Sequence, residues 1–196
     1  MRRLATAGLI LATFCALGGS TATAQVRAIA GVGLGVPVGD FADDNGYSAQ
    51  SGGATALAGI EWLPGRRNFG IRVDAAWNRF CTSACDPAGG SLDIRYRFLN
   101  VNVNGLVELP VGGNPDFRPY LTAGAGVYGH KLEGDDAPEH GFAKSVTDVG
   151  VNGGLGVLYT LGRVGVFAEG RLHNIFVDGS DIQYIPVMLG AKIALQ

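Results

Sequence analysis

Apolar residues alternate with polar or small residues along eight segments of the chain after residue 25. In residues 69–79, Val73 and Trp77 share one phase of this alternation, and Arg72 and Asp74 share the other. Side chains of a β-strand point alternately to opposite faces, so a period of two residues predicts strands rather than helices. The predicted strands span residues 26–36, 54–63, 69–79, 92–109, 118–129, 146–160, 164–176 and 183–195.

The alternation slips once, in the strand predicted for residues 92–109. Tyr96 and Phe98 are in one apolar phase, but Leu99 and Val101 continue in the other. A β-bulge adds one residue to a strand and so restores the side on which later residues point. We therefore expect a bulge at Phe98–Leu99.

The connections between the predicted strands alternate in length. Three are long, at residues 37–53, 80–91 and 130–145, and three are short, at residues 64–68, 110–117 and 161–163. Short segments of alternating hydrophobicity with long connections at one end and short turns at the other are typical of membrane β-barrels. The predicted fold is all-β: an eight-stranded antiparallel up-and-down transmembrane β-barrel.

Glycine indicates which face of the barrel points inward. The chain has 32 glycines among 196 residues, and many lie in the polar phase of the strands. Glycine weakens a strand, but the lumen of an eight-stranded barrel is just wide enough for side chains to fill. We therefore expect the apolar phase to face lipid and the lumen to hold a network of ion pairs. The candidate residues are Glu61, Arg72, Asp74, Asp93, Arg95, Arg97, Asp148, Glu169 and Arg171.

Aromatic residues in the apolar phase form two predicted bands, as expected at the two membrane interfaces. Trp62, Phe69 and Tyr159 lie near the short connections. The band near the long connections is predicted from Trp77, Tyr96 and Phe98.

The N-terminus has the features of a secretory signal peptide. Arg2 and Arg3 precede an uncharged, mostly apolar run at residues 4–17, and small residues lead to Ala24. This pattern predicts a signal peptide at residues 1–24 and a barrel domain at residues 25–196. Export would allow Cys81 and Cys85 to form a small loop disulfide.

Two segments carry a resemblance to a known group of proteins. Residues 119–128 read PYLTAGAGVY and residues 189–195 read LGAKIAL. With the strand pattern, they resemble the small outer-membrane β-barrel families, the OmpA-like, OmpX-like and opacity-type barrel domains. This resemblance implies a barrel-only protein in the cell outer membrane, in contact with its lipid and inserted by the outer-membrane assembly machinery.

The sequence also argues against several activities. The formal net charge of −2 excludes a basic nucleic-acid-binding surface as the organising theme. Gly124–Gly129 matches the Gly-x-Gly-x-x-Gly pattern, but a loop follows it where a dinucleotide site needs a helix. Glu169, Arg171 and His173 share the lumen phase, and a resemblance to the barrel enzymes that deacylate lipid A would imply a His-x-Ser arrangement. Ile175 stands two residues after His173 in place of that serine, and without a nucleophile acyl transfer is not supported.

The predicted function is therefore a non-enzymatic outer-membrane barrel with a structural or surface-contact role through its long loops. We expect a monomer with no cofactor, no metal and no nucleic-acid partner. Three alternatives stay open: a small solute pore, a lipid A-modifying enzyme and a soluble lipocalin-like carrier.

The predicted loops hold ten of the seventeen acidic residues, namely Asp40, Asp43, Asp44, Asp86, Glu133, Asp135, Asp136, Glu139, Asp178 and Asp181.

Overall fold

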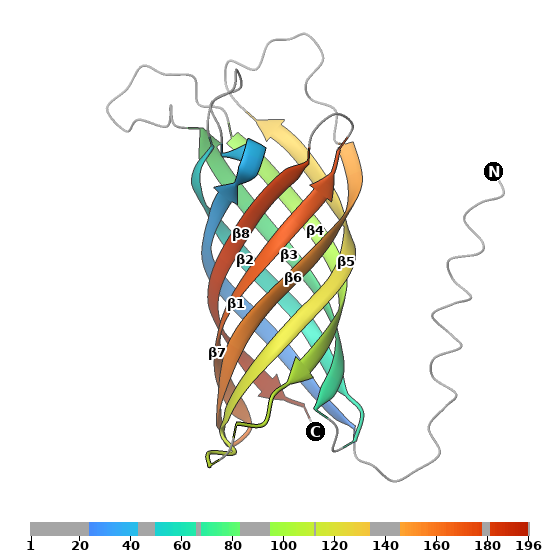
Figure 1. The fold of residues 1–196 in the computed structure, drawn as a ribbon, viewed down its shortest axis with the longest axis vertical. Helices are drawn as coiled ribbons and strands as arrows, with labels where there is room; N and C mark the ends of the chain where they lie inside the picture. Colours follow the sequence, from blue (N-terminus) through green and yellow to red (C-terminus); the bar gives the residue numbers. More distant parts are fainter. Residues whose placement is uncertain are drawn as a thin grey trace, which may run out of the picture.

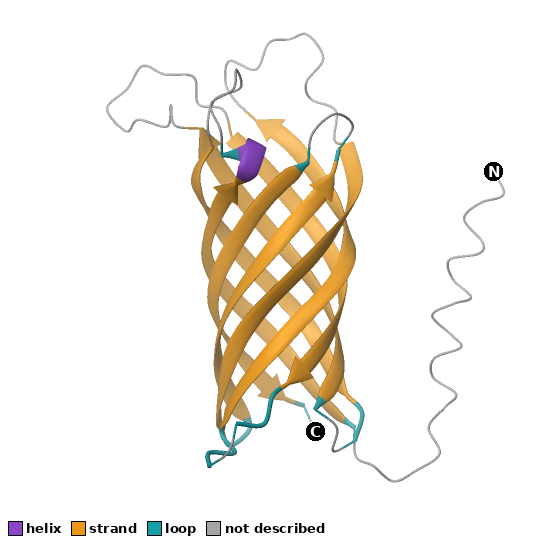
Figure 2. Ribbon diagram, in the orientation of Figure 1, coloured by secondary structure: helices purple, strands orange, loops and turns teal. Residues whose placement is uncertain are grey.

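The computed structural model describes residues 24–42, 50–65, 68–82, 95–111, 113–133, 146–177 and 181–195. Within these residues, eight strands and one short 3-10 turn form a single closed barrel (Figures 1 and 2). The elements are β1 (Gln25–Val38), η2 (Gly39–Phe41), β2 (Gln50–Leu63), β3 (Phe69–Thr82), β4 (Arg95–Glu108), β5 (Phe117–Glu133), β6 (Val146–Leu161), β7 (Val164–Phe176) and β8 (Ile182–Ala194). Among the described residues, no helix has the length and apolar character that crossing a bilayer requires.

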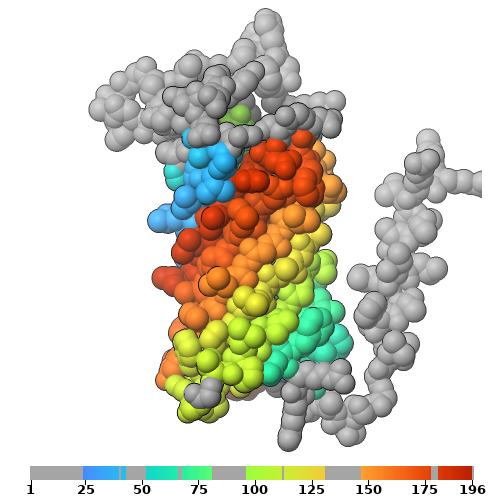
Figure 3. Space-filling view, in the orientation of Figure 1, coloured from blue at the N-terminus to red at the C-terminus, as the bar shows by residue number. Residues whose placement is uncertain are grey.

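Each strand pairs antiparallel with the next one along the chain, and β8 closes the barrel against β1. The predicted fold, an eight-stranded up-and-down β-barrel, is confirmed. The strands are tilted against the long axis, which is visible as diagonal bands of colour in the space-filling view (Figure 3). Closure of a sheet into a barrel requires this tilt. The closure pairs the two edge strands of the sheet with each other.

The short connections lie at the end of the barrel where β1 begins and β8 ends (Figure 1). Gly65 and Gly162 in these turns have φ values of 69° and 65°. This left-handed conformation is readily adopted only by glycine, which explains why these turns can be tight. We call this end the short-connection end and the opposite one the long-connection end.

The outer wall of the barrel is apolar, as predicted, and the interior holds the buried charged and polar side chains together with three clusters of buried apolar ones. Leu155 on the outside is 66% exposed, whereas Arg72 on the inside is 0% exposed. Large apolar side chains are exposed on all eight strands, and a lipid environment would solvate them. Within the described barrel, the lumen is therefore the place where the protein can surround a charged side chain with compensating groups.

The expected bulge at Phe98–Leu99 is wrong. β4 pairs with β3 without a register shift from Val107 to Arg95, and with β5 equally regularly. The alternation is therefore unbroken, and Phe98 points into the lumen while Leu99 points out. The register shift that the described strands do contain lies between Ser51 and Gly53, where β2 pairs with β3.

Inward glycines make room for the large side chains of neighbouring strands. A Cβ added at Gly35 would lie 2.8 Å from the ring of Phe80, and one added at Gly53 would lie 2.9 Å from the same ring. On the other side of the barrel, a Cβ at Gly150 would lie 2.8 Å from the ring of Tyr128. Protein interiors are close-packed, so the rings of Phe80 and Tyr128 fit because no side chain stands at these glycines.

Candidate functional site

The lumen holds an unbroken chain of alternating cations and anions, which we call the central network. Its members come from β2, β3, β7 and β8, and in order of contact they are Lys192, Glu61, Arg72, Glu169, Arg171 and Asp74. The three cations and three carboxylates balance in formal charge. All six side chains are buried.

Arg72 lies at the middle of the central network. Its Nη2 is 2.7 Å from Glu61 Oε1, and its Nη1 is 2.7 Å from Glu169 Oε2. The register places Glu61 directly opposite Arg72 on the neighbouring strand, whereas Glu169 reaches it across the lumen from β7. Arg72 therefore links β2 and β3 to β7 across the lumen.

The two ends of the central network are also paired. Arg171 lies with Nη2 2.6 Å from Glu169 Oε1 and Nη1 3.1 Å from Asp74 Oδ2. Lys192 Nζ lies 2.8 Å from Glu61 Oε1. Buried charges are tolerated only when they are paired and hydrogen-bonded, and each of these groups meets that condition.

Neutral side chains supply further hydrogen bonds to the carboxylates. Asn102 and Asn104 donate to Asp74 at 3.0 and 2.9 Å. Tyr120 donates its hydroxyl hydrogen to Glu169 Oε2 at 2.9 Å, and Lys192 Nζ lies 4.1 Å from the centre of the Tyr120 ring. The last contact is close enough for a cation–π interaction.

A second group of charges lies at the short-connection end. Arg27 donates to Glu108 Oε1, and Arg118 Nη1 lies 3.1 Å from Glu108 Oε2. Arg27 also approaches Glu61 Oε2 at 3.8 Å, which joins this group to the central network. A cavity of about 450 Å³ lined in part by Arg27, Glu108 and Arg118 opens here.

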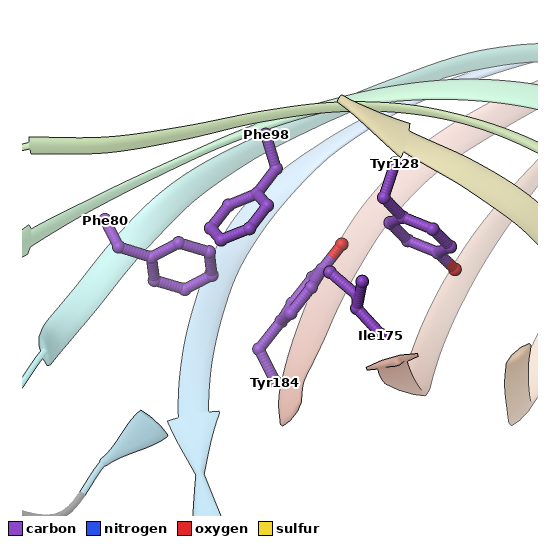
Figure 4. Close-up of a cluster of buried hydrophobic side chains, with 5 residues drawn as sticks. All are labelled: Phe80, Phe98, Tyr128, Ile175 and Tyr184. Carbon is purple, nitrogen blue, oxygen red and sulfur yellow. The ribbon is translucent and has the colours of Figure 1, made fainter. Parts of the chain in front are cut away.

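An aromatic cluster fills the lumen towards the long-connection end, and we call it the aromatic cap. Figure 4 shows its five buried members, Phe80, Phe98, Tyr128, Ile175 and Tyr184, pointing into the space enclosed by the strands. The ring of His173 stacks on that of Tyr184, with 4.8 Å between centroids and an interplanar angle of 3°. Tyr128 and His173 Nδ1 share a hydrogen bond of 2.8 Å.

The structure brings together five of the nine candidate ion-pair residues: Glu61, Arg72, Asp74, Glu169 and Arg171. Asp148 is half-buried and lies 3.4 Å from His130 Nδ1, away from the central network. Arg97 is exposed on the outer wall, so its assignment to the lumen is wrong. Asp93 and the side chain of Arg95 lie outside the described part of the chain.

Four of the six candidate girdle residues face outward: Trp62, Phe69, Trp77 and Tyr159. The assignment of Phe98 and Tyr96 to the outer wall is wrong, because Phe98 is 0% exposed and Tyr96 packs against the aromatic cap. Their error and that of Arg97 have one cause, since the regular register of β4 reverses the face assumed for its first residues. For the predicted disulfide, Cys85 and the side chain of Cys81 lie outside the described residues.

Sequence reasoning missed several lumen residues. Lys192, Arg27 and Glu108 take part in ion pairs. Tyr120, Asn102 and Asn104 donate hydrogen bonds to carboxylates of the central network. A signal for the asparagines was present, because Asn100, Asn102 and Asn104 occupy one phase of a strand whose other phase is apolar. A contact that crosses the lumen leaves no comparable local pattern.

Comparison with known proteins gives the same fold. Neisserial surface protein A matches with a TM-score of 0.61 and 14% identity, over 87% of this chain and 96% of that chain. A major outer membrane protein from Thermus thermophilus matches with a TM-score of 0.56 and 13% identity, over 88% of this chain and 100% of that chain. Ail, the attachment invasion locus protein of Yersinia pestis, matches with a TM-score of 0.53 and 14% identity, over 88% of this chain and 98% of that chain.

A search of curated proteins finds no match. The family model described as outer membrane protein beta-barrel domain matches residues 9–190, which is most of the chain. The chain therefore belongs to the outer membrane protein beta-barrel domain family.

Proposed function

We propose that this protein is an exported, non-enzymatic outer-membrane barrel whose filled lumen does not conduct solutes. Its role is structural or one of surface contact, carried by the connections at the long-connection end. The proposal rests on one observation above all: the lumen is occupied across its width by paired side chains that water does not reach. Arg72 and Arg171 at its centre are 0% and 1% exposed.

A water-filled pore would leave its lining accessible to solvent. Towards the long-connection end, the next layer is also hydrogen-bonded: Thr55 donates to Asn78 at 2.7 Å, and Asn78 donates to Asn100 at 3.0 Å and to the Tyr184 hydroxyl of β8 at 3.4 Å. The aromatic cap closes the next layer. The cavity at the short-connection end reaches Arg27, which lies 3.8 Å from Glu61 of the central network, and this arrangement supports a vestibule rather than a pore.

Conductance in planar lipid bilayers tests the closed lumen. We expect no stepwise conductance from the wild-type protein. The double substitution Arg72→Ser with Glu169→Ser removes one cation and one anion together, so it empties the centre without leaving a net charge. The aromatic cap still closes the lumen of this variant, so we expect conductance only when Phe98→Ala and Tyr184→Ala are added, whereas Val73→Ala with Leu155→Ala on the outer wall should stay silent. Stepwise conductance from the wild type would overturn the proposal.

The surroundings of His173 support the absence of an enzymatic role. Its Nδ1 is engaged by the Tyr128 hydroxyl, its ring is stacked on Tyr184, and it is buried. An acyl-transfer site needs a nucleophile within hydrogen-bond reach of its base and a path for substrate. Expression in a bacterial host should therefore leave the lipid A mass spectrum unchanged, and a new lipid species would contradict the proposal.

The outer wall supports a membrane location over the soluble-carrier alternative. Soluble monomers rarely expose contiguous apolar patches beyond a few hundred Å², and here exposed apolar side chains surround the barrel. The protein should fractionate with the outer membrane and migrate faster on a gel before heating than after. A protein recovered in the soluble fraction without detergent would refute this location.

A further inference from the structure

The cavity at the short-connection end combines charged and amide groups with apolar walls. Its volume is about 450 Å³, and its charged lining residues are Arg27, Glu108 and Arg118. Amide side chains come from Gln25, Asn68 and Asn114. The apolar part of the lining is formed by Leu63, Leu109, Pro110, Val111, Pro115 and Phe117. Cavities of about 300–1,000 Å³ with apolar walls and a few polar groups are typical of small-molecule sites.

The charges that line this cavity do not balance, unlike those of the central network. Arg27 and Arg118 share one carboxylate, because Arg27 donates to Glu108 Oε1 and Arg118 Nη1 lies 3.1 Å from Glu108 Oε2. Arg27 also lies 3.8 Å from Glu61, but Glu61 already belongs to the balanced central network. The described lining therefore carries one positive charge in excess, which favours a ligand with a single negative charge.

Arg118 is the cation most available to such a ligand. Its side chain is 43% exposed, whereas that of Arg27 is 8% exposed. Arg118 Nε donates to the Pro115 backbone oxygen at 3.0 Å, and Nη1 donates to Glu108. An arginine has five N–H donors, and Arg118 Nη2 has no acceptor among the residues that the structure describes. Two existing bonds thus orient a guanidinium that still has donors for a ligand.

We propose that this cavity binds a small organic monocarboxylate with an apolar body. The guanidinium of Arg118 donates to the carboxylate, a geometry that arginine matches with two parallel hydrogen bonds. The amide side chains of the lining are further donors, and the apolar walls enclose the body of the ligand. A carboxylate fits better than a phosphate monoester, because the monoester carries nearly two negative charges at neutral pH and the cavity offers one compensating charge.

The direction of entry follows from the barrel. Short connections of outer-membrane barrels face the periplasm, so the ligand reaches the cavity from that side. This step rests on the membrane location given under Proposed function, whereas the cavity and its charge do not depend on it.

Calorimetric titration of the protein in phosphatidylcholine nanodiscs tests the site, with empty nanodiscs as the blank. The probe is 3-phenylpropanoate, and we expect saturable binding of one probe per barrel. The neutral 3-phenylpropanamide keeps the body without the charge, and formate keeps the charge without the body. Each should bind at least about tenfold more weakly than the probe. Equal binding of either one would overturn the proposal.

Arg118→Gln should weaken binding of 3-phenylpropanoate at least about tenfold. The matched control is Arg163→Gln, which removes the same charge at the same end from an exposed residue that does not line this cavity. The control should bind like the wild type, and heat-dependent gel mobility shows that both variants are folded. Equal weakening in the two variants would mean that the probe responds to the overall charge of this end, and the site would be refuted.

Nuclear Overhauser contacts locate the bound probe. Its ring protons should contact the methyl groups of Leu63, which is 4% exposed and lines the cavity. Contacts with Leu155 on the outer wall in place of Leu63 would show a probe dissolved in lipid and overturn the proposal. A protein that folds, fractionates with the outer membrane and binds no probe refutes this site alone. Failure to fractionate there refutes the proposed function.

Discussion

Strand β3 carries arginine on both of its faces, and the surroundings of the two arginines differ. Arg72 points into the lumen, where two carboxylates lie 2.7 Å from its nitrogens. Arg79 lies on the outer wall, directly opposite a second arginine, Arg97. The first arginine is neutralised by carboxylates of the lumen, whereas the second belongs to a row of cationic positions.

Position along the barrel explains this difference. A charge that faces lipid near the bilayer midplane costs about 2–4 kcal/mol, and near the interface it costs about 0–1 kcal/mol. Arg72 faces the lumen and is compensated there, whereas Arg79 lies near the end of the strand, beyond Trp77. We therefore expect substitutions inside the lumen to change stability strongly, and substitution of Arg79 on the outer wall to change it little.

The largest expected effect comes from Glu169→Gln. Glu169 is shared by Arg72 and Arg171, so its neutralisation leaves two buried cations with one carboxylate fewer. Breaking a buried pair in this way costs about 3–5 kcal/mol. Urea unfolding from phosphatidylcholine vesicles measures the loss. Glu108→Gln should cost less because its partner Arg118 is partly exposed, and equal losses would contradict the view that the centre is the more sensitive layer.

A smaller loss is expected from Gly35→Ala. The added Cβ would lie 2.8 Å from the Phe80 ring, so the aromatic cap must shift. Overpacking of this kind costs about 1–3 kcal/mol. The same measurement on Gly170→Ala is the control, because nothing lies within 4 Å of the Cβ added there. Adding Phe80→Leu should recover part of the loss at Gly35, and no recovery would show that the ring is not the obstacle.

The face on which side chains lie is predictable from the sequence for β7 but not for the first residues of β4. β7 spans Val164–Phe176 as predicted, because its alternation runs without interruption between two clear turns. β4 contains Tyr96 and Phe98, whose hydrophobicity fits either face of a barrel that is capped by aromatic rings. Periodicity alone does not distinguish an aromatic residue in lipid from one in the cap, so the first residues of β4 were assigned to the wrong face.

The central network was predictable in composition but not in its connections. Glu61 and Arg72 come from consecutive strands, and their pairing follows once the register of β2 and β3 is known. Arg72 and Glu169 are 97 residues apart and meet across the lumen. That contact depends on the closure and tilt of the whole barrel, which no local pattern encodes.

A third loss, of about 1 kcal/mol, is expected from Tyr120→Phe. The substitution removes the hydroxyl that donates to Glu169 Oε2 but keeps the ring beside Lys192. In a double-mutant cycle with Glu169→Gln, the two losses should not add, because they act on the same carboxylate. Additive losses in urea unfolding would show that the hydroxyl stabilises the barrel by another route.

The smallest effect on stability is expected from Arg79→Gln, on the outer face of β3. This side chain lies on the outer wall, so its loss leaves every ion pair of the central network in place. In vesicles of phosphatidylcholine, the free energy of unfolding should change by no more than about 0.5 kcal/mol. The matched variant on the inner face is Arg72→Gln, which removes the partner of both Glu61 and Glu169 and should cost several times more. Equal losses in urea unfolding would mean that the two faces of β3 do not differ in this way.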